Sequence, residues 1–196
     1  TVRGLLKVVF LPNYNVSLAE SIIPAADLSE QISTAGFEAS GTSNMKFGLN
    51  GALTIGTMDG ANVEMHERVG AEHMFIFGLS AQQVEARKQA GEFHAGPDIA
   101  ASHRLNDVLQ AIRGGVFSPD DPGRYVGLID GLIDYDRFLV CADFDAYWDA
   151  QARVEAHWHD SKEWWRSAVL NTARMGWFSS DRTIREYATE IWKALD

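Results

Sequence analysis

The sequence predicts an α/β fold, a doubly wound parallel sheet followed by a mostly helical C-terminal region. Short apolar runs alternate with helix-like segments over about residues 1–95, and longer segments of helical periodicity fill about residues 96–196. Alternating strands and helices are typical of a parallel sheet that is covered by helices. A run of small and polar residues also follows one expected strand, where ligands bind in folds of this class.

The α/β part contains four runs that we expect to be strands, because they are apolar and end at turn-forming residues. These runs are Leu5–Phe10, Ile32–Thr34, Ala52–Thr57 and Met74–Gly78. Helices are expected between and after them, at Ser17–Ile23, Asn44–Asn50, Val63–Val69 and Ser80–Ala90. Ser17 and Glu20 match a capping box, and Pro24 indicates that the first helix is brief or bent.

The helical part has apolar residues at the spacing of a helix face, most clearly from Arg104 to Ile112. Tyr125–Ile133 and the long stretch Phe144–Ala173 are also expected to be helical. A short extended piece is expected at Phe138–Val140. Ser179, Ser180 and Asp181 are typical of a helix cap, which predicts a last helix over Thr183–Leu195.

Composition excludes several classes of partner. The net charge of −10 argues against nucleic acid or an anionic membrane as partner, whereas a neutral polymer is compatible with it. No apolar stretch reaches the roughly 18 residues of a membrane span. The single cysteine, Cys141, cannot form an internal disulfide and fits a reducing compartment. We expect it to be a buried small residue and not a reactive thiol.

The most informative segment is Glu38–Phe47, with the sequence EASGTSNMKF. Small residues let backbone amides approach an anion closely. A helix that begins near Ser43 would favour a phosphate at its N-terminus. Lys46 could then hold an aldehyde as a Schiff base, the alternative being a surface lysine on a short helix. These residues predict a phosphorylated ligand beside a nucleophilic amine.

At this point a family resemblance becomes clear. EASGTSNMK, together with LNGALTIGTMDGANVEM downstream and IIPAADLSEQISTAG upstream, closely resembles the glycogen/starch (maltodextrin) phosphorylases. The resemblance runs from Leu6 to Lys193, and members of the family are several times longer. It implies the C-terminal, pyridoxal-phosphate-binding portion of an α-glucan phosphorylase, with the N-terminal domain absent. The implied architecture is part of the C-terminal half of a glycosyltransferase-B fold, whose active site lies between two halves.

The resemblance also implies residue roles. Lys46 matches the lysine that binds pyridoxal 5′-phosphate, and Thr42 and Ser43 match positions whose backbone amides hold the cofactor phosphate. Many members have glycine at the Ser43 position. Tyr14 is a neighbour of the cofactor site. Asn15 replaces an arginine of many animal members and cannot supply its charge, so the phosphate contacts are expected to depend on other cations.

Glu38, Ser40 and Gly41 match the positions that bind the glucosyl residue. With Lys46, Glu38 is therefore expected to carry the catalytic site. No metal site is expected, because Asp59-Gly60-Ala61-Asn62 is typical of a turn and helix cap and has no histidine or cysteine at ligand spacing.

The implied reaction is retaining phosphorolysis of a terminal α-1,4-linked glucose to glucose 1-phosphate, in which the cofactor phosphate assists proton transfer. The implied partners are an α-glucan, inorganic phosphate and the N-terminal part of the same enzyme, in a cytoplasmic homodimer. Two alternatives stay open for the isolated chain, an inactive fragment and a module that binds glucan or a partner. Ser43-Asn44-Met45-Lys46 also matches the S-x-x-K of serine acyl-enzymes, but the companion motifs are absent.

Overall fold

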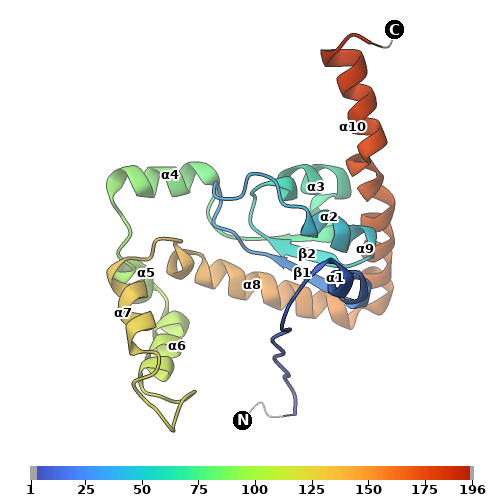
Figure 1. Cartoon of the computed structure of the whole chain (residues 1–196). Helices are drawn as coiled ribbons and strands as arrows, with labels where there is room; N and C mark the ends of the chain where they lie inside the picture. The colour runs from blue at the N-terminus through green and yellow to red at the C-terminus, as the bar shows by residue number, and fades with distance from the viewer. Residues whose placement is uncertain (1–3, 195–196) are drawn as a thin grey trace.

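The computed structural model describes residues 4–194. A small parallel sheet carries helices on both faces, and a helical region follows it (Figure 1). The strands are β1 (Leu28–Gln31), β2 (Leu53–Gly56) and β3 (Met74–Ile76), paired in the order β1-β2-β3. The expected α/β class is confirmed, and the division near residue 95 stays a prediction.

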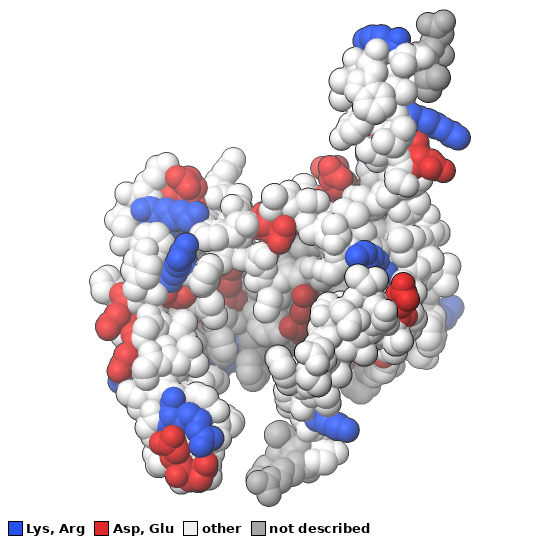
Figure 2. All heavy atoms as spheres, in the orientation of Figure 1, with Lys and Arg blue, Asp and Glu red and all other residues white. Residues whose placement is uncertain are grey.

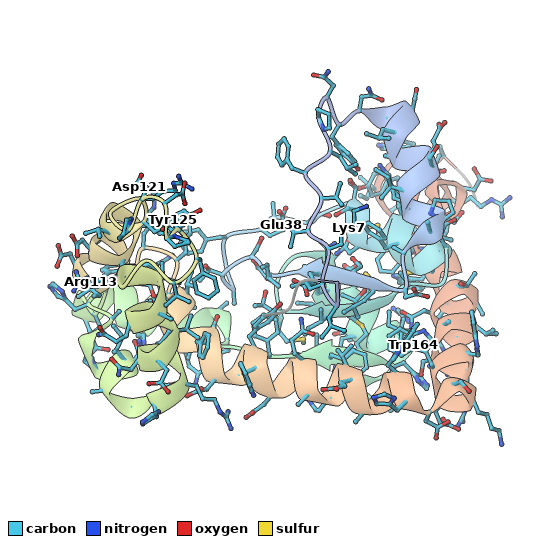
Figure 3. All side chains as sticks on the ribbon, turned by 90° about the horizontal axis from the view of Figure 1, so that it is seen from below. Lys7, Glu38, Arg113, Asp121, Tyr125 and Trp164 are labelled. Carbon is cyan, nitrogen blue, oxygen red and sulfur yellow. The ribbon has the colours of Figure 1, made fainter. Side chains whose placement is uncertain are left out.

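One face of the sheet packs on α8 (Val140–His159) and α9 (Ser161–Arg174). Side chains alternate between the faces of a strand, so every second residue points to these helices. The resulting core joins strand residues to residues of both helices: Leu53, Ile55, Phe75, Phe77, Ala150, Val154, Trp164 and Ala168. Trp164 lies on α9 next to the sheet (Figure 3).

The opposite face is covered by the two crossover helices, α2 (Ser43–Leu49) between β1 and β2 and α3 (Ala61–Val69) between β2 and β3. A second core of Met65, Val69, Met74 and Met175 fills the space beneath them. The sheet is therefore buried on both sides, as expected for parallel strands.

A separate helical lobe lies at the other end of α8. It contains α5 (Gly96–Ala101), α6 (His103–Arg113) and α7 (Val126–Asp134), and its core is formed by Ala95, Leu105, Leu109, Ile129 and Cys141. The helix α4 (Ala81–Ala90) packs through Val84 in another core, with Ala35 and Leu139. Ser80 and Gln83 form a complete capping box at the start of α4. The long helix α8 thus connects this lobe to the sheet (Figure 1).

The first expected strand, Leu5–Phe10, is wrong. The segment has no regular secondary structure, and Leu5 and Phe10 are 88% and 92% exposed. An apolar run becomes a strand only when a neighbouring strand accepts its hydrogen bonds, and β1 pairs only with β2 within the described residues. The second expected strand, Ile32–Thr34, lies instead at Leu28–Gln31, where Leu28 is opposite Leu53.

The N-terminal helix is α1 (Val16–Ile22), one residue earlier than expected. Its cap is Asn15, whose Oδ1 accepts the Leu18 amide at 3.1 Å, so the expected Ser17–Glu20 capping box is wrong. Asn15 caps the helix in place of Ser17 because its own backbone is still extended, as an N-cap residue requires. The bend expected at Pro24 is confirmed by a short 3₁₀ turn at Ile23–Ala25.

Later boundaries also differ from the expectation. Phe138–Val140 is not extended, because Leu139 has a positive φ of 52° and α8 begins at Val140. The helical stretch Phe144–Ala173 consists of two helices that meet at Asp160, whose side chain caps α9 by accepting the Glu163 amide at 3.2 Å.

The last helix begins earlier than expected, as α10 (Ser180–Glu186), and passes into a π-helical turn at Tyr187–Ile191. It projects from the body of the molecule (Figure 1). The expected end of this helix, Leu195, lies outside the described residues.

Among the helices of residues 4–194, none combines the length and the apolar character that a membrane span requires. Acidic and basic side chains are interspersed on the face shown in Figure 2.

Candidate functional site

A polar pocket of about 340 Å³ lies at the carboxyl ends of β1 and β2. Its walls come from the segment after β1, from the first residues of α2 and from the turn between β2 and α3. They are Glu30, Gln31, Ile32, Ser33, Glu38, Ser40, Gly41, Asn44, Thr57, Asp59 and Asn62. The pocket therefore forms where ligands bind in open parallel sheets.

Hydrogen bonds join the two loops of the pocket, the loop after β1 and the turn after β2. Asp59 Oδ2 accepts the amides of Phe37 and Glu38 at 3.2 and 2.7 Å. The Ala61 amide donates to the Ser40 carbonyl at 2.5 Å. Between them Gly60 has a φ of 50°, and a Cβ there would lie 2.4 Å from the Ser40 oxygen. Only glycine allows the loops to approach this closely.

The floor of the pocket is a buried amide network. Asn62 Nδ2 donates to the carbonyls of Thr57 and Gln31 at 3.0 and 3.4 Å, and Asn62 Oδ1 accepts Asn44 Nδ2 at 3.0 Å. Asn44 Oδ1 in turn accepts the Met45 amide at 2.9 Å, at the start of α2. These two asparagines hold the lysine-bearing helix against the sheet, and the sequence analysis did not assign them this role. The Asp-Gly-Ala-Asn turn is the only signal that pointed to this region.

Three of the predicted site residues line the pocket together: Glu38, Ser40 and Gly41. Glu38 is exposed on the loop between β1 and α2 (Figure 3), and its Oε1 accepts the Ser40 amide at 3.2 Å. Gly41 has a φ of 85°, which turns the chain into α2. The loop thus presents a carboxylate, a hydroxyl and backbone groups to the same space.

Thr42 and Ser43 stand at the N-terminal end of α2, and Lys46 follows one turn later. Thr42 occupies the cap position without a side-chain hydrogen bond, and its carbonyl accepts the Lys46 amide at 3.3 Å. Lys46 is exposed and forms no ion pair within the described residues. Its amine is therefore accessible to solvent, and Lys46 does not line the pocket.

The helix of Lys46 is fixed from behind by α9. Thr172 Oγ1 donates to the Gly48 carbonyl at 3.2 Å. A Cβ at Gly48 would lie 3.0 Å from the Met175 side chain, so the two segments are in close contact. Tyr14 is 63% exposed on the segment before α1 and does not line the pocket, so its place beside a cofactor stays a prediction.

The charged side chains that line the pocket are all acidic. Its lining includes three carboxylates, those of Glu30, Glu38 and Asp59, but no lysine or arginine among the described residues. Glu30 is already engaged, because it accepts hydrogen bonds from Tyr147 and Gln151 at 2.7 to 3.1 Å. Such a lining suits the hydroxyl groups of a neutral ligand better than a phosphate.

These residues fit the aldehyde group of a phosphorylated aldehyde cofactor better than they fit its phosphate group. A free primary amine lies one turn from a loop whose Gly41 leaves the backbone accessible. A counter-charge for a phosphate is lacking in the pocket lining. No group of three or more His, Cys, Asp or Glu suited to a metal ion is found in residues 4–194.

Fold and pocket together define an α/β protein with a polar pocket at the carboxyl edge of a parallel sheet. The sequence model described as carbohydrate phosphorylase matches residues 1–194. The chain therefore belongs to the carbohydrate phosphorylase family.

Curated relatives agree with the family match. The chain is 56% identical over 189 residues to the brain form of glycogen phosphorylase from Bos taurus, a match of 96% of this chain and 22% of that protein. It is 53% identical to a glycogen phosphorylase of Synechocystis (98% and 22% covered) and 52% identical to one of Haemophilus influenzae (97% and 23%). The chain thus spans about a fifth of the length of these relatives.

Proposed function

We propose that this chain is the cofactor-bearing portion of an α-1,4-glucan phosphorylase, which releases a terminal glucose from an α-glucan as glucose 1-phosphate with retained configuration. The observation that carries the proposal is the convergence of Glu38, Ser40 and Gly41 on one pocket beside the helix of Lys46, in a chain of this family.

The pocket would hold the glucosyl residue. A carboxylate accepts two sugar hydroxyls, while the hydroxyl of Ser40 and the backbone at Gly41 contact others. Such a site selects strongly for the complete sugar, because a missing hydroxyl leaves a buried polar group without a partner. In this proposal Asp59 has a positioning role, since it holds the loop that places the Glu38 carboxylate.

Lys46 would bind pyridoxal 5′-phosphate covalently through Nζ, with the cofactor phosphate at the amides of Thr42 and Ser43 and with Tyr14 nearby. When bound, this cofactor supplies a phosphate that exchanges a proton near neutral pH. The chain's own contribution is positional: the Asn44–Asn62 pair and the Thr172–Gly48 contact keep α2 in place while the glucosyl site forms beside it.

The remaining parts of the proposal concern partners. Because no lysine or arginine of residues 4–194 lines the pocket, the phosphate charges would be balanced by groups of the N-terminal part of the same enzyme. The exposed apolar segment Leu5–Phe10 offers that part a surface to cover. We further propose a cytoplasmic homodimer, as is usual for the family.

The test uses the protein that contains this chain. Borohydride reduction followed by peptide mapping should find the cofactor mass on Lys46. Lys46→Ala should lose both the adduct and the cofactor absorbance, whereas Lys162→Ala, which changes another exposed lysine, should keep them. An unmodified Lys46 peptide in protein that turns over glucan would overturn the proposal.

A further inference from the structure

A buried polar cluster lies on the α8–α9 side of the sheet, away from the pocket. It joins His73, which ends the 3₁₀ turn before β3, to His157 of α8 and Ser167 of α9. His73 Nδ1 and His157 Nε2 lie 2.9 and 3.0 Å from Ser167 Oγ. His73 is 5% exposed and Ser167 is fully buried, so one hydroxyl has to satisfy two imidazole nitrogens.

The neighbours of the cluster assign a direction to these hydrogen bonds. Glu72 Oε1 lies 3.4 Å from His73 Nε2. An ionised carboxylate only accepts, so neutral His73 carries its proton on Nε2 and leaves Nδ1 as an acceptor. Ser167 then donates to His73 and accepts the Nε2 proton of His157. These tautomers give a hydrogen-bonded chain from His157 through Ser167 to His73, with the Glu72 carboxylate beside its end.

The surroundings oppose a charge on His73. Burial is the main cause that lowers its pKa, Glu72 acts in the opposite direction, and Arg174, Arg166 and His157 lower it further. Phe75 and Trp164 pack their rings against His157, at centroid distances of 5.6 and 5.8 Å. The other charged groups around the cluster line the same surface hollow: Arg153, Asp160 and Glu163.

Protonation of His73 changes which hydrogen bonds the three side chains of the cluster can form. A proton on His73 Nδ1 turns this atom into a donor, so Ser167 has to accept from it and turn its own proton toward His157. That reversal is possible only if His157 carries its proton on Nδ1. A second proton, on His157, would direct two N–H groups at one oxygen and leave the hydroxyl proton without an acceptor. A proton on His73 therefore breaks the existing hydrogen-bond pattern, and both Ser167 and His157 have to rearrange before the cluster is satisfied again.

Helix α9 connects this cluster to the helix of Lys46. Asn171, one turn after Ser167, donates to the His73 carbonyl at 3.3 Å. Thr172 Oγ1 lies 3.2 Å from the Gly48 carbonyl near the end of α2 and 3.2 Å from the Ala168 carbonyl of α9, so its proton is shared between these two acceptors. A shift of α9 at Ser167 therefore acts on α2 through a neighbouring turn of the same helix.

We propose that His73, Ser167 and His157 form a pH-sensitive latch that holds α9 against β3 and α8, closed when His73 is neutral. Through Thr172 the latch also fixes α2, and this second part matters for activity only if Lys46 has its proposed role. The sign follows from linkage: below about pH 6.5 the unfolded or opened state binds more protons than the closed one. The latch thus contributes its full stability above that pH and loses it as the pH falls toward the lowered pKa of His73.

Hydrogen exchange resolved by peptide tests the latch in the protein that contains this chain. After correction for intrinsic rates, the opening of α9 and β3 should rise several-fold from about pH 8 to about pH 5.5, on either side of the ordinary histidine pKa of about 6.5. His73→Asn keeps a side-chain acceptor near the Nδ1 position without titrating, so it should abolish the pH response. His159→Gln, at an exposed histidine of the same helix as His157, should retain it.

Three results would overturn the latch: equal opening at both pH values, a wild-type response in His73→Asn, or loss of the response in His159→Gln. If His73→Asn fails to fold, ¹⁵N shifts of the wild-type imidazoles decide instead, since a proton on His73 Nδ1 near pH 8 contradicts the proposed chain. For the second part, α2 should also open more at the lower pH, and Thr172→Val should remove this response from α2 but not from α9. None of these readouts requires cofactor or turnover, so they can fail or succeed independently of the proposed function.

Discussion

At the scale of single residues, close backbone approach decides the shape of the pocket. Gly60 lets the turn after β2 meet the loop that carries Glu38, and the Ser40 carbonyl occupies the space that a Cβ would need. Asp59, directly before it, receives two amides of the same loop. A glycine and an aspartate therefore position a carboxylate that lies about twenty residues earlier in the chain.

Gly60→Ala is expected to destabilise the folded state by about 1–3 kcal/mol, because it adds a Cβ at a positive φ and forces the two loops apart. Urea unfolding measures this change. Gly131→Ala is the matched control, since Gly131 lies in α7 with nothing within 4 Å of its Cβ position, and it should be neutral or stabilising by up to about 1 kcal/mol. Equal effects of the two substitutions would contradict this account of the loop.

At the scale of elements, the first turn of α8 is organised by a buried carboxylate. Asp136 accepts the amides of Val140 and Cys141 at 3.0 and 2.7 Å, and so satisfies donors that have no partner inside the helix. Burial, reinforced by Asp136, raises the pKa of Cys141 to about 12. The expectation of a buried, unreactive thiol agrees with this environment, since Cys141 is 4% exposed.

Cys141 should therefore resist a thiol reagent, because only about one thiol in 10,000 is ionised near pH 8 when the pKa is about 12. Asp136→Ala should accelerate labelling several-fold, as it removes the neighbouring charge and frees the first turn of α8. Asp120→Ala, which changes an exposed carboxylate paired with Arg124, serves as the control. Fast labelling of the folded wild-type chain would refute the assignment.

At the scale of the whole molecule, the polar pocket contains carboxylates, but no lysine or arginine of residues 4–194 lines it. The excess of 27 acidic over 17 basic residues leaves a net charge of −10, and no lysine or arginine lines the pocket in the described residues. Backbone amides can hold one phosphate, but arginine and lysine bind phosphates more strongly through charge-assisted hydrogen bonds. We therefore expect phosphorolysis to need groups from outside this chain, which spans about a fifth of the length of its relatives.

The purified chain should accordingly form no glucose 1-phosphate from glucan and phosphate, with or without added cofactor. Addition of the remaining part of its parent protein should restore the product, as measured by a coupled assay with phosphoglucomutase. Substantial turnover by the chain alone would show that its own residues supply the missing charge. Restoration with a Lys46→Ala chain would instead argue against the cofactor lysine.

Local signals determined much of this structure from the sequence alone. The helices predicted at Asn44–Asn50 and Ser80–Ala90 and the strand within Ala52–Thr57 were confirmed, because breakers and buried apolar runs act over a few residues. The family resemblance rested on three motifs between Ile22 and Met65. The strand predicted at Leu5–Phe10 was wrong because a strand depends on hydrogen bonds to a neighbouring strand, which its own residues do not specify.

Only the tertiary structure decided which distant groups share a partner. Asn44 meets Asn62 beneath the pocket, and Ser167 lies between His73 and His157, although nothing in their spacing along the chain announces either contact. The roles of Lys46 and Tyr14 remain predictions of the sequence. Buried polar groups require partners wherever the fold brings them, so their chemistry is set by packing between elements and not by the local pattern.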